Sequence, residues 1–277
     1  MITSIIFSKD RACQLDLLLY SIEKNFKDTD ELYVIYKHTS DLFEKGYDLL
    51  IDRFSYNKQI KFVLESDFQK DTIRVCSEAK NKYLAFFVDD DIVYRPVSVS
   101  SFLEEAFDEN MSCVSLRLGS NTVIQDFYTD QPCVIPDIHG IIEKGDDKVF
   151  IWSWVSLGGH HTNFGYPFSV DGHIYPKEDI CPIIQKYDYD TPNAFEGRFD
   201  KNWLKPNICC LEISSVVNTP LNLVGSSQNR AGEHFGVSLE ELNTIYIRGS
   251  RISLEDMDFS DIMGCHQELP IKFKDRT

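Results

Sequence analysis

The sequence lacks a long hydrophobic run and an excess of basic residues. Its N-terminal segment has an apolar run of only three residues before charges appear, and no apolar stretch reaches the length of a membrane span. We therefore expect a cytoplasmic protein without a transmembrane segment. Lys and Arg number 28 against 44 Asp and Glu, for a formal net charge of -16, and no basic cluster interrupts that balance. This charge argues against nucleic-acid partners and against a general attraction to anionic membranes.

The sequence also lacks Cys-x-x-Cys spacing, although it holds eight cysteines. Several of them lie in apolar runs such as NICCLEI, which is typical of buried thiols. We expect neither a zinc site nor a disulfide framework. The cysteines are Cys13, Cys76, Cys113, Cys133, Cys181, Cys209, Cys210 and Cys265.

Two common phosphate-binding motifs are absent as well. There is no GxGxxG and no GxxxxGK[ST], so a Rossmann dinucleotide site and a P-loop are poorly supported. Phosphatases with an aspartyl nucleophile carry Asp-x-Asp on their first strand, whereas the first expected strand here ends in SKDR.

The chain of 277 residues, 43% hydrophobic, is long enough for one large α/β domain. Its first part alternates between strand and helix patterns, and crossovers of this length predict a mostly parallel sheet with helices on both faces. The expected strands are 2–7, 31–37, 60–64 and 83–88, and the expected helices are 12–25, one from Thr39 or Ser40 to about 51, and one from Asp67 or Asp71.

After Pro96 the pattern loosens. A tract rich in aromatic residues, from about 120 to 176, predicts a wall of the site or a second subregion. A capping box at Ser238 and Glu241 predicts the start of a late helix. Other expected elements are helices near 98–108 and from Thr191, and strands 113–116, 166–170 and 207–217.

The segment YLAFFVDDDIVYR, residues 83–95, carries the strongest functional signal. A buried strand ends on three carboxylates, and Asp89 and Asp91 lie on the same side of an extended chain. Such a pair suits a hard divalent cation, and the carboxyl ends of strands are where open α/β sheets bind nucleotides. The pattern predicts a metal-bridged pyrophosphate; an acidic turn or helix cap is the alternative.

A polar turn follows the first expected strand. Ser8, Lys9, Asp10 and Arg11 lie where a strand gives way to a helix, a position that offers N–H groups and cations to an anion. We assign them to donor binding, with a capped helix and a solvated charged turn as the alternative.

These features together resemble the GT-A-fold glycosyltransferases that use nucleotide-diphospho-sugars, similar to bacterial family-2-like members. The resemblance covers the order of elements over residues 1–110; beyond that it is carried by scattered motifs. It implies Mn²⁺ or Mg²⁺ held by Asp89 and Asp91. We also assign Asp90 and Arg74 to donor binding. Which aspartate binds the metal directly stays open. A C-terminal histidine often completes the cation in this family, which implies His266 as a ligand; a surface or core histidine is the alternative.

Further residues are candidates for closing the site and for the chemistry. The stretch 218–236 is polar and contains glycine, so it is either a loop that closes over the diphosphate with Arg230 or an ordinary surface loop. Glycosyl transfer needs a carboxylate for the sugar and, in an inverting enzyme, a base. Asp171 is the expected sugar-facing group, and Asp179 or Glu178 the base.

Three other sets of residues are open to two interpretations. Helix capping also explains Glu178 and Asp179, and Glu196 is a further candidate for which a helix-surface role is the simpler expectation. Trp152 and Trp154 share a side and could stack on a sugar, although core packing is the commoner fate of Trp. His160 and His161 are adjacent, a poor arrangement for one metal, and are expected on a loop or the acceptor side.

The expected function is a metal-dependent glycosyltransferase of the hexosyltransferase class. Residues 1–110 would bind the nucleotide sugar, expected to be a UDP-sugar, and residues 111–277 would bind a glycan or lipid-linked acceptor and close the site. The acceptor or a partner could hold the protein at the inner face of a membrane. The alternatives are a sugar nucleotidyltransferase, which needs a Gly-rich loop that FSKDRACQ lacks, and a non-catalytic carbohydrate- or nucleotide-binding module.

Overall fold

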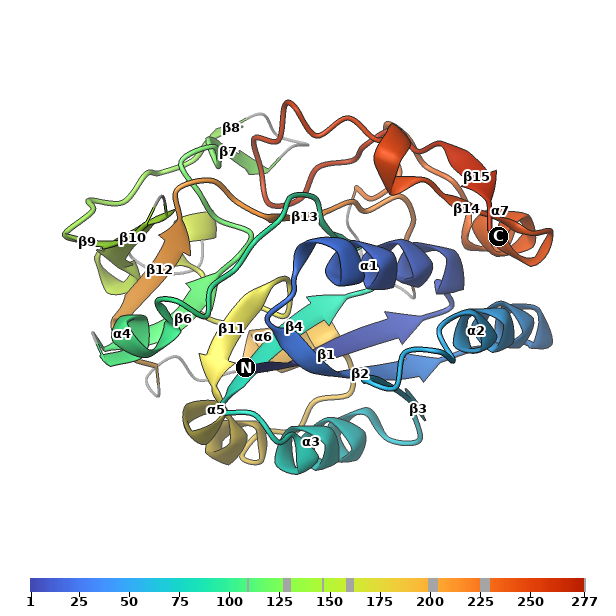
Figure 1. The fold of residues 1–277 in the computed structure, drawn as a ribbon, viewed down its shortest axis with the longest axis horizontal. Coiled ribbons are helices and arrows are strands. Elements are labelled where there is room, and N and C mark those ends of the chain that lie inside the picture. Colours follow the sequence, from blue (N-terminus) through green and yellow to red (C-terminus); the bar gives the residue numbers. More distant parts are fainter. Residues whose placement is uncertain are drawn as a thin grey trace.

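The protein folds around one large mixed sheet. The computed structural model describes residues 1–108, 110–126, 131–145, 147–157, 162–198, 204–224 and 230–276. In these residues the main sheet has the strand order β3-β2-β1-β4-β11-β6-β12-β10-β9. Helices cover it on both faces, and the expectation of a mostly parallel α/β sheet is confirmed (Figure 1).

The N-terminal half is built as the alternating pattern predicts. Strands β1, β2, β3 and β4 run parallel, so their carboxyl ends meet at one edge of the sheet. Helices α1 and α3 follow β1 and β3, and the N-cap Asp67 accepts a hydrogen bond from the N–H of Lys70. The elements are β1 Ile2–Lys9, α1 Ala12–Asn25, β2 Thr29–Lys37, α2 Asp41–Arg53, β3 Ile60–Leu64, α3 Phe68–Glu78 and β4 Tyr83–Val88.

The second half extends the same sheet, so residues 1–110 and 111–277 both contribute strands to it. Strand β11 (His173–Pro176) runs antiparallel to β4, with His173 opposite Phe86 and Pro176 opposite Tyr83. The chain just before β11 therefore lies at the carboxyl edge of β4, and the chain just after it lies at the opposite edge. The remaining strands are β5 Asp91–Val93, β6 Met111–Ser115, β7 Ile124–Asp126, β8 Gln131–Pro132, β9 Gly140–Lys144, β10 Asp147–Ser153, β12 Asn207–Leu211, β13 Val216–Asn218, β14 Ser250–Ile252 and β15 Phe273–Asp275.

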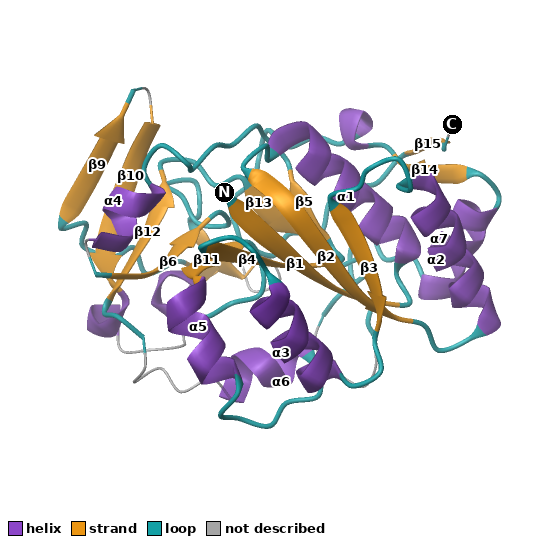
Figure 2. Cartoon of the chain, turned by 60° about the horizontal axis from the view of Figure 1, so that its bottom comes forward, coloured by secondary structure: helices purple, strands orange, loops and turns teal. Residues whose placement is uncertain are grey.

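The core lies on both faces of the sheet because successive strand residues point to opposite sides. Ile2 and Ile6 belong to one hydrophobic layer, whereas Ile5 and Phe7 belong to the other. Figure 2 shows α3, α5 and α6 together on one side of the sheet, away from α1, α2 and α7. The remaining helices are α4 Leu103–Asp108, α5 Lys177–Ile184, α6 Pro192–Arg198 and α7 Leu239–Ile247, with 3-10 turns at Trp154–Leu157, Asn163–Gly165 and Leu254–Asp256.

Three expected elements differ from the structure. Residues 166–170 are not a strand; the strand begins only after Gly172, whose φ of 67° turns the chain. A Cβ added at this position would crowd Val216. The segment 207–217 breaks into β12 and β13 because Ser215 and Val216 both donate to the carbonyl of Leu116. The expected helix 98–108 is shorter, since the carboxylate of Asp28 accepts the N–H groups of Val99 and Ser100 in a preceding turn.

The caps and the cysteines follow the sequence more closely. Ser238 accepts the N–H of Glu241 at the start of α7, and Thr191 accepts the N–H of Ala194 at the start of α6, so both helix starts are confirmed. All eight cysteines are free thiols; seven are buried and Cys181 is half-buried. Among the helices that the structure describes, none has the length and apolar character needed to cross a bilayer.

Candidate active site at the carboxyl edge of β4

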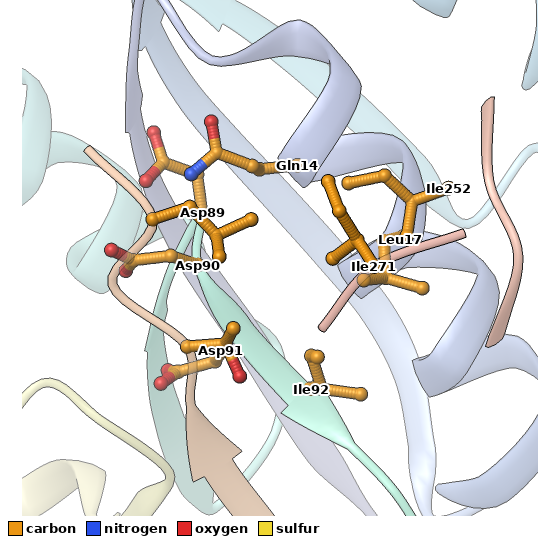
Figure 3. A pocket seen from close by; sticks show the side chains of 10 residues that line it. Gln14, Leu17, Asp89, Asp90, Asp91, Ile92, Ile252 and Ile271 are labelled. Carbon is orange, nitrogen blue, oxygen red and sulfur yellow. The ribbon is translucent and has the colours of Figure 1, made fainter. Parts of the chain in front are cut away.

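The three aspartates leave β4 in a tight turn rather than as an extended strand. Asp89 and Asp90 form the turn, and Asp91 begins β5, which pairs with β13. All three residues are buried. Figure 3 shows their carboxylates pointing away from the apolar side chains of Leu17 and Ile252. These apolar side chains line a cavity of about 10 Å³ beneath the turn, room for about one water molecule and no sugar.

Arg11 links two of the aspartates. Its Nη1 donates to Oδ1 of Asp89 at 2.9 Å and to Oδ2 of Asp90 at 2.8 Å. Its Nε donates to Oδ1 of Asn222 at 2.8 Å, and the guanidinium is almost fully buried. The sequence predicted that Asp89 and Asp91 would act together, but the turn breaks the two-residue alternation, and Arg11 joins Asp89 to Asp90 instead.

Asp89 is already engaged by the protein. Its Oδ2 accepts the backbone N–H of Lys9 at 3.0 Å, in addition to the bond from Arg11 at Oδ1. Burial raises the pKa of Asp89 to about 6, against the opposing charge of Arg11. The carboxylate therefore holds β1, α1 and the turn after β4 together.

Asp91 lies in a more negative environment. Its Oδ1 accepts from the side chain of Asn218 at 3.1 Å, and its Oδ2 accepts the N–H of Val88 at 3.0 Å. Burial and the charges of Asp171 and Asp90 raise the pKa of Asp91 well above its usual value. Asp91 is thus the member of the triplet on which the charge of Asp171 acts most clearly.

Asp171 is held between a cation and an imidazole. Arg117 donates to its Oδ2 at 3.1 Å, and Nε2 of His266 lies 3.2 Å from the same oxygen. Although burial raises the pKa of Asp171, the hydrogen bond from His266 and the charge of Arg117 outweigh it and keep the pKa below the usual value. These contacts favour the ionised form of Asp171, whose charge in turn raises the pKa of Asp91.

The predicted metal ligands do not converge as a set. Among the described residues, no group of three or more His, Cys, Asp or Glu side chains is placed to hold a metal ion. Asp89 is engaged by Arg11 and Lys9, and His266 contacts Asp171 instead of the triplet. Asp91 fits a cation on chemical grounds, because a divalent ion would offset its repulsion with Asp171 and Asp90.

The polar turn after β1 is tied to its surroundings. Oγ of Ser8 lies 2.7 Å from the hydroxyl of Tyr47, and the two oxygens of Asp10 accept the N–H and the hydroxyl of Thr39 at 2.7 and 2.8 Å. Asp10 has a φ of 59°, which these two bonds stabilise. Ser8 and Asp10 are thus buried beside the start of α2, and the charge of Asp10 is held by hydrogen bonds rather than by solvent.

Two predicted donor-binding arginines pair with nearby acidic residues. Arg74 lies on α3, where it contacts Asp71 at 2.9 Å and Glu78 at 3.8 Å. Arg230 is half exposed and contacts Glu233 at 3.1 Å. None of these contacts joins either arginine to the three aspartates. Residues 225–229 of the expected closing loop lie outside the described residues.

Glu178 and Asp179 do not join Asp171. Both begin α5, which follows β11, and β11 has carried the chain to the opposite edge of the sheet. Asp179 there pairs with Lys205 at 2.7 Å, beside a hollow of about 240 Å³. The role of either residue as the base stays a prediction, and the antiparallel direction of β11 places both of them away from Asp171.

Glu196, in contrast, lies close enough to Asp171 for the charge of Asp171 to raise its pKa. It reaches the segment before β11, where its Oε1 accepts the N–H of Val170 at 2.6 Å and its Oε2 lies 3.5 Å from the hydroxyl of Tyr166. The expected helix-surface role is wrong. Nothing in the local pattern of PNAFEGR indicates that α6 packs against this segment, since the contact depends on the tertiary fold.

The two tryptophans of the aromatic tract fill the core. Trp152 is fully buried and Trp154 nearly so, and their indole N–H groups donate to the carbonyls of Phe164 and Lys205 at 2.9 and 2.7 Å. Core packing is confirmed, and these residues offer no open face to a sugar. His160 and His161 lie outside the described residues.

Of three comparisons with known proteins, the one with solved structures found a likeness in fold. No protein-family model matches the sequence, and no curated protein matches it. The crystal structure of S. aureus TarS 1-349 matches with a TM-score of 0.50 and 14% identity, covering 79% of this chain and 61% of that one. The crystal structure of S. aureus TarS matches with a TM-score of 0.49 and 14% identity, covering 78% of this chain and 36% of that one. The crystal structure of TarS 1-349 in complex with UDP-GlcNAc matches with a TM-score of 0.47 and 12% identity, covering 86% of this chain and 62% of that one.

The first of these likenesses bears on the architecture. The chain spans less than two thirds of the length of TarS 1-349. TarS is a GT-A-like family-2 glycosyltransferase, so the GT-A-like fold implied by the sequence resemblance is confirmed. At 14% identity the match establishes the fold alone.

Proposed function

We propose that the protein is a glycosyltransferase that moves a sugar from a nucleotide-diphospho-sugar to a glycan or lipid-linked acceptor. One observation carries the proposal: in a GT-A-like sheet, the antiparallel β11 brings Asp171 beside Asp91 at the carboxyl edge of β4. This is the edge at which open α/β sheets bind nucleotides, and the two carboxylates could serve the diphosphate and the transferred sugar.

The roles divide by position. The turn Ser8–Arg11 and Asp90 would border the donor, with Arg11 holding Asp89 and Asp90 in place. Asp171 would accept hydrogen bonds from the sugar hydroxyls. A divalent cation at Asp91 would offset the charge that builds on the leaving diphosphate. Catalysis would then be mainly electrostatic and positional.

A UDP-sugar is the proposed donor. The solved structures of S. aureus TarS 1-349 include complexes with UDP and with UDP-GlcNAc, so UDP-GlcNAc is the first sugar nucleotide to test. The assay is release of UDP from UDP-GlcNAc and other UDP-sugars in the presence of Mn²⁺, with and without glycan acceptors. Turnover with any of them supports the proposal. Nucleotide binding without turnover of any donor would favour a binding module instead.

A further inference from the structure

Two carboxylates near β11 have opposite surroundings. Asp171 is bound by Arg117 and His266, whereas the hydrogen-bond partners of Glu196 are neutral: the N–H of Val170 and the hydroxyls of Tyr166 and Ser169. One of the pair is stabilised as an anion by cationic or imidazole donors. The other is half-buried and lies near that anion.

The fold holds Glu196 in this position from both sides. Helix α6 begins at the Thr191 cap, and Phe195 is buried in the layer that also contains Phe168 and Phe7. Phe195 contacts Phe168 with ring centroids 5.1 Å apart, so the helix is packed directly against the segment before β11. The next residue, Glu196, is thereby directed at the backbone of Val170, one residue before Asp171.

Charged and titratable groups around Glu196 come from two segments, one after β6 and one before β11. Arg117 follows β6, Tyr166 and Asp171 precede β11, and the Arg117 guanidinium lies 5.7 Å from the centre of the Tyr166 ring. Burial and the charge of Asp171 raise the pKa of Glu196 to about 7, and Arg117 opposes this shift. The pKa of Asp171 is instead kept below its usual value. Two carboxyl groups whose pKa values are pushed apart divide the roles of proton acceptor and permanent anion.

We propose that Glu196 is the general base that accepts the proton of the acceptor hydroxyl, with Asp171 as the ionised carboxylate that positions the sugar. This proposal rests on the proposed function. As the acceptor oxygen attacks the anomeric carbon, its proton passes to Oε2 of Glu196. The bond from the anomeric carbon to the diphosphate oxygen breaks, and its electron pair leaves with the nucleoside diphosphate. Glu196 then returns the proton to water.

The oxygen assignment follows from the contacts. Oε1 is fixed by the short bond from Val170, whereas Oε2 has the Tyr166 hydroxyl only at the long limit of a hydrogen bond. An incoming hydroxyl therefore competes with a weaker contact at Oε2. A glutamine retains an oxygen that can accept from Val170 but has no second basic oxygen, so Glu196→Gln separates the chemistry from the packing.

The test compares Glu196→Gln with the wild type and with Glu44→Gln, an exposed glutamate on α2. UDP release from UDP-GlcNAc, with water as acceptor, should fall by about 100-fold or more in E196Q, the size of a general-base contribution. UDP affinity should stay within about twofold, and E44Q should match the wild type in both. The acidic limb of the wild-type pH profile of kcat/KM, near pH 7, should disappear in the residual activity of E196Q. If E196Q had the turnover of the wild type and the same acidic limb in its pH profile, Glu196 would not be the general base.

A second measurement does not depend on donor turnover. The side-chain carboxyl carbons of ¹³C-labelled glutamate should include one that titrates near neutral pH and is absent from E196Q. If the resonance lost in E196Q titrates at an ordinary glutamate pKa, the inference about Glu196 is wrong even if the protein transfers sugars. If the neutral titration is present but no nucleotide sugar binds, the proposed function is wrong, and with it the catalytic role.

Discussion

Nε2 of His266 lies 3.2 Å from Oδ2 of Asp171, although 95 residues separate the two in the sequence. The contact joins the C-terminal segment to the carboxyl edge of β4, where His266 also bridges to Asn218 of β13. The histidine expected as a metal ligand thus reaches the site through Asp171. The contact leaves two roles to separate by experiment: orientation of a carboxylate, and ligation of a cation.

Replacement of His266 by Ala is expected to weaken the dependence of UDP binding on Mn²⁺. The substitution removes a candidate ligand and also the hydrogen bond that helps to keep Asp171 ionised. Calorimetric titration with UDP, with and without Mn²⁺, measures the effect, and His139→Ala, an exposed residue, is the control. If H266A retains the wild-type metal affinity, His266 is not a ligand.

Asp91→Asn should leave the protein folded and remove transfer. The asparagine keeps one oxygen for the N–H of Val88 and loses the repulsion with Asp171, so the free energy of unfolding should change by no more than about 1 to 2 kcal/mol. Chemical denaturation and UDP-sugar turnover measure the two quantities. Asp48→Asn, on the exposed side of α2, is the matched control, and a D91N variant with unchanged turnover would contradict the role of Asp91.

Arg11→Met is expected to destabilise the fold by about 3 to 5 kcal/mol, because it leaves two buried carboxylates without their cation. Adding Asp89→Asn to that variant should restore part of the loss, since one of the two charges is then removed. Denaturant unfolding of the two single variants and the double variant gives the coupling energy. Full additivity of the two substitutions would show that the ion pair does not stabilise this turn.

Stability is expected to increase as the pH falls from about 7 toward 4.5. The pKa of Glu196 is raised from 4.5 to about 7, so between these values the folded state binds more protons than the unfolded state. At lower pH the trend reverses, because hydrogen bonds and ion pairs lower the pKa of Glu31 and of Asp71 to about 2, and their contribution is lost as they protonate. The free energy of unfolding, measured from pH 8 to 3, should pass through a maximum. Above pH 4.5 it should change less steeply with pH in E196Q than in the wild type. An equal slope in E196Q would contradict the shift at Glu196.

Local patterns predicted most of the N-terminal half. The apolar run Tyr83–Val88 and the strand Ile60–Leu64 match the structure residue for residue, and the helix Ala12–Asn25 follows its hydrophobic stripe. Each of these elements follows from interactions among neighbouring residues and a simple burial pattern. The caps at Asp67 and Ser238 were predictable for the same reason.

The site was harder to predict because its contacts are non-local. The antiparallel direction of β11 separates Asp171 from Asp179. The direction in which a strand pairs cannot be predicted from the periodicity of its sequence. The bonds from Arg11 to Asp89 and Asp90 span nearly eighty residues, and the contact from α6 to Val170 requires the packed helix. The aspartate triplet was recognisable in the sequence, but the groups that surround each aspartate were not.

The most direct test of the proposed function is calorimetric titration of the protein with UDP, with and without Mn²⁺, against GDP and CMP. A nucleotide-sugar site at the carboxyl edge of β4 predicts UDP binding that is stronger in the presence of Mn²⁺ and weaker binding of GDP and CMP. Preference for GDP or CMP would be consistent with a glycosyltransferase that uses a different nucleotide sugar as its donor. Absence of metal-dependent binding of any of the three nucleotides would contradict the proposed function.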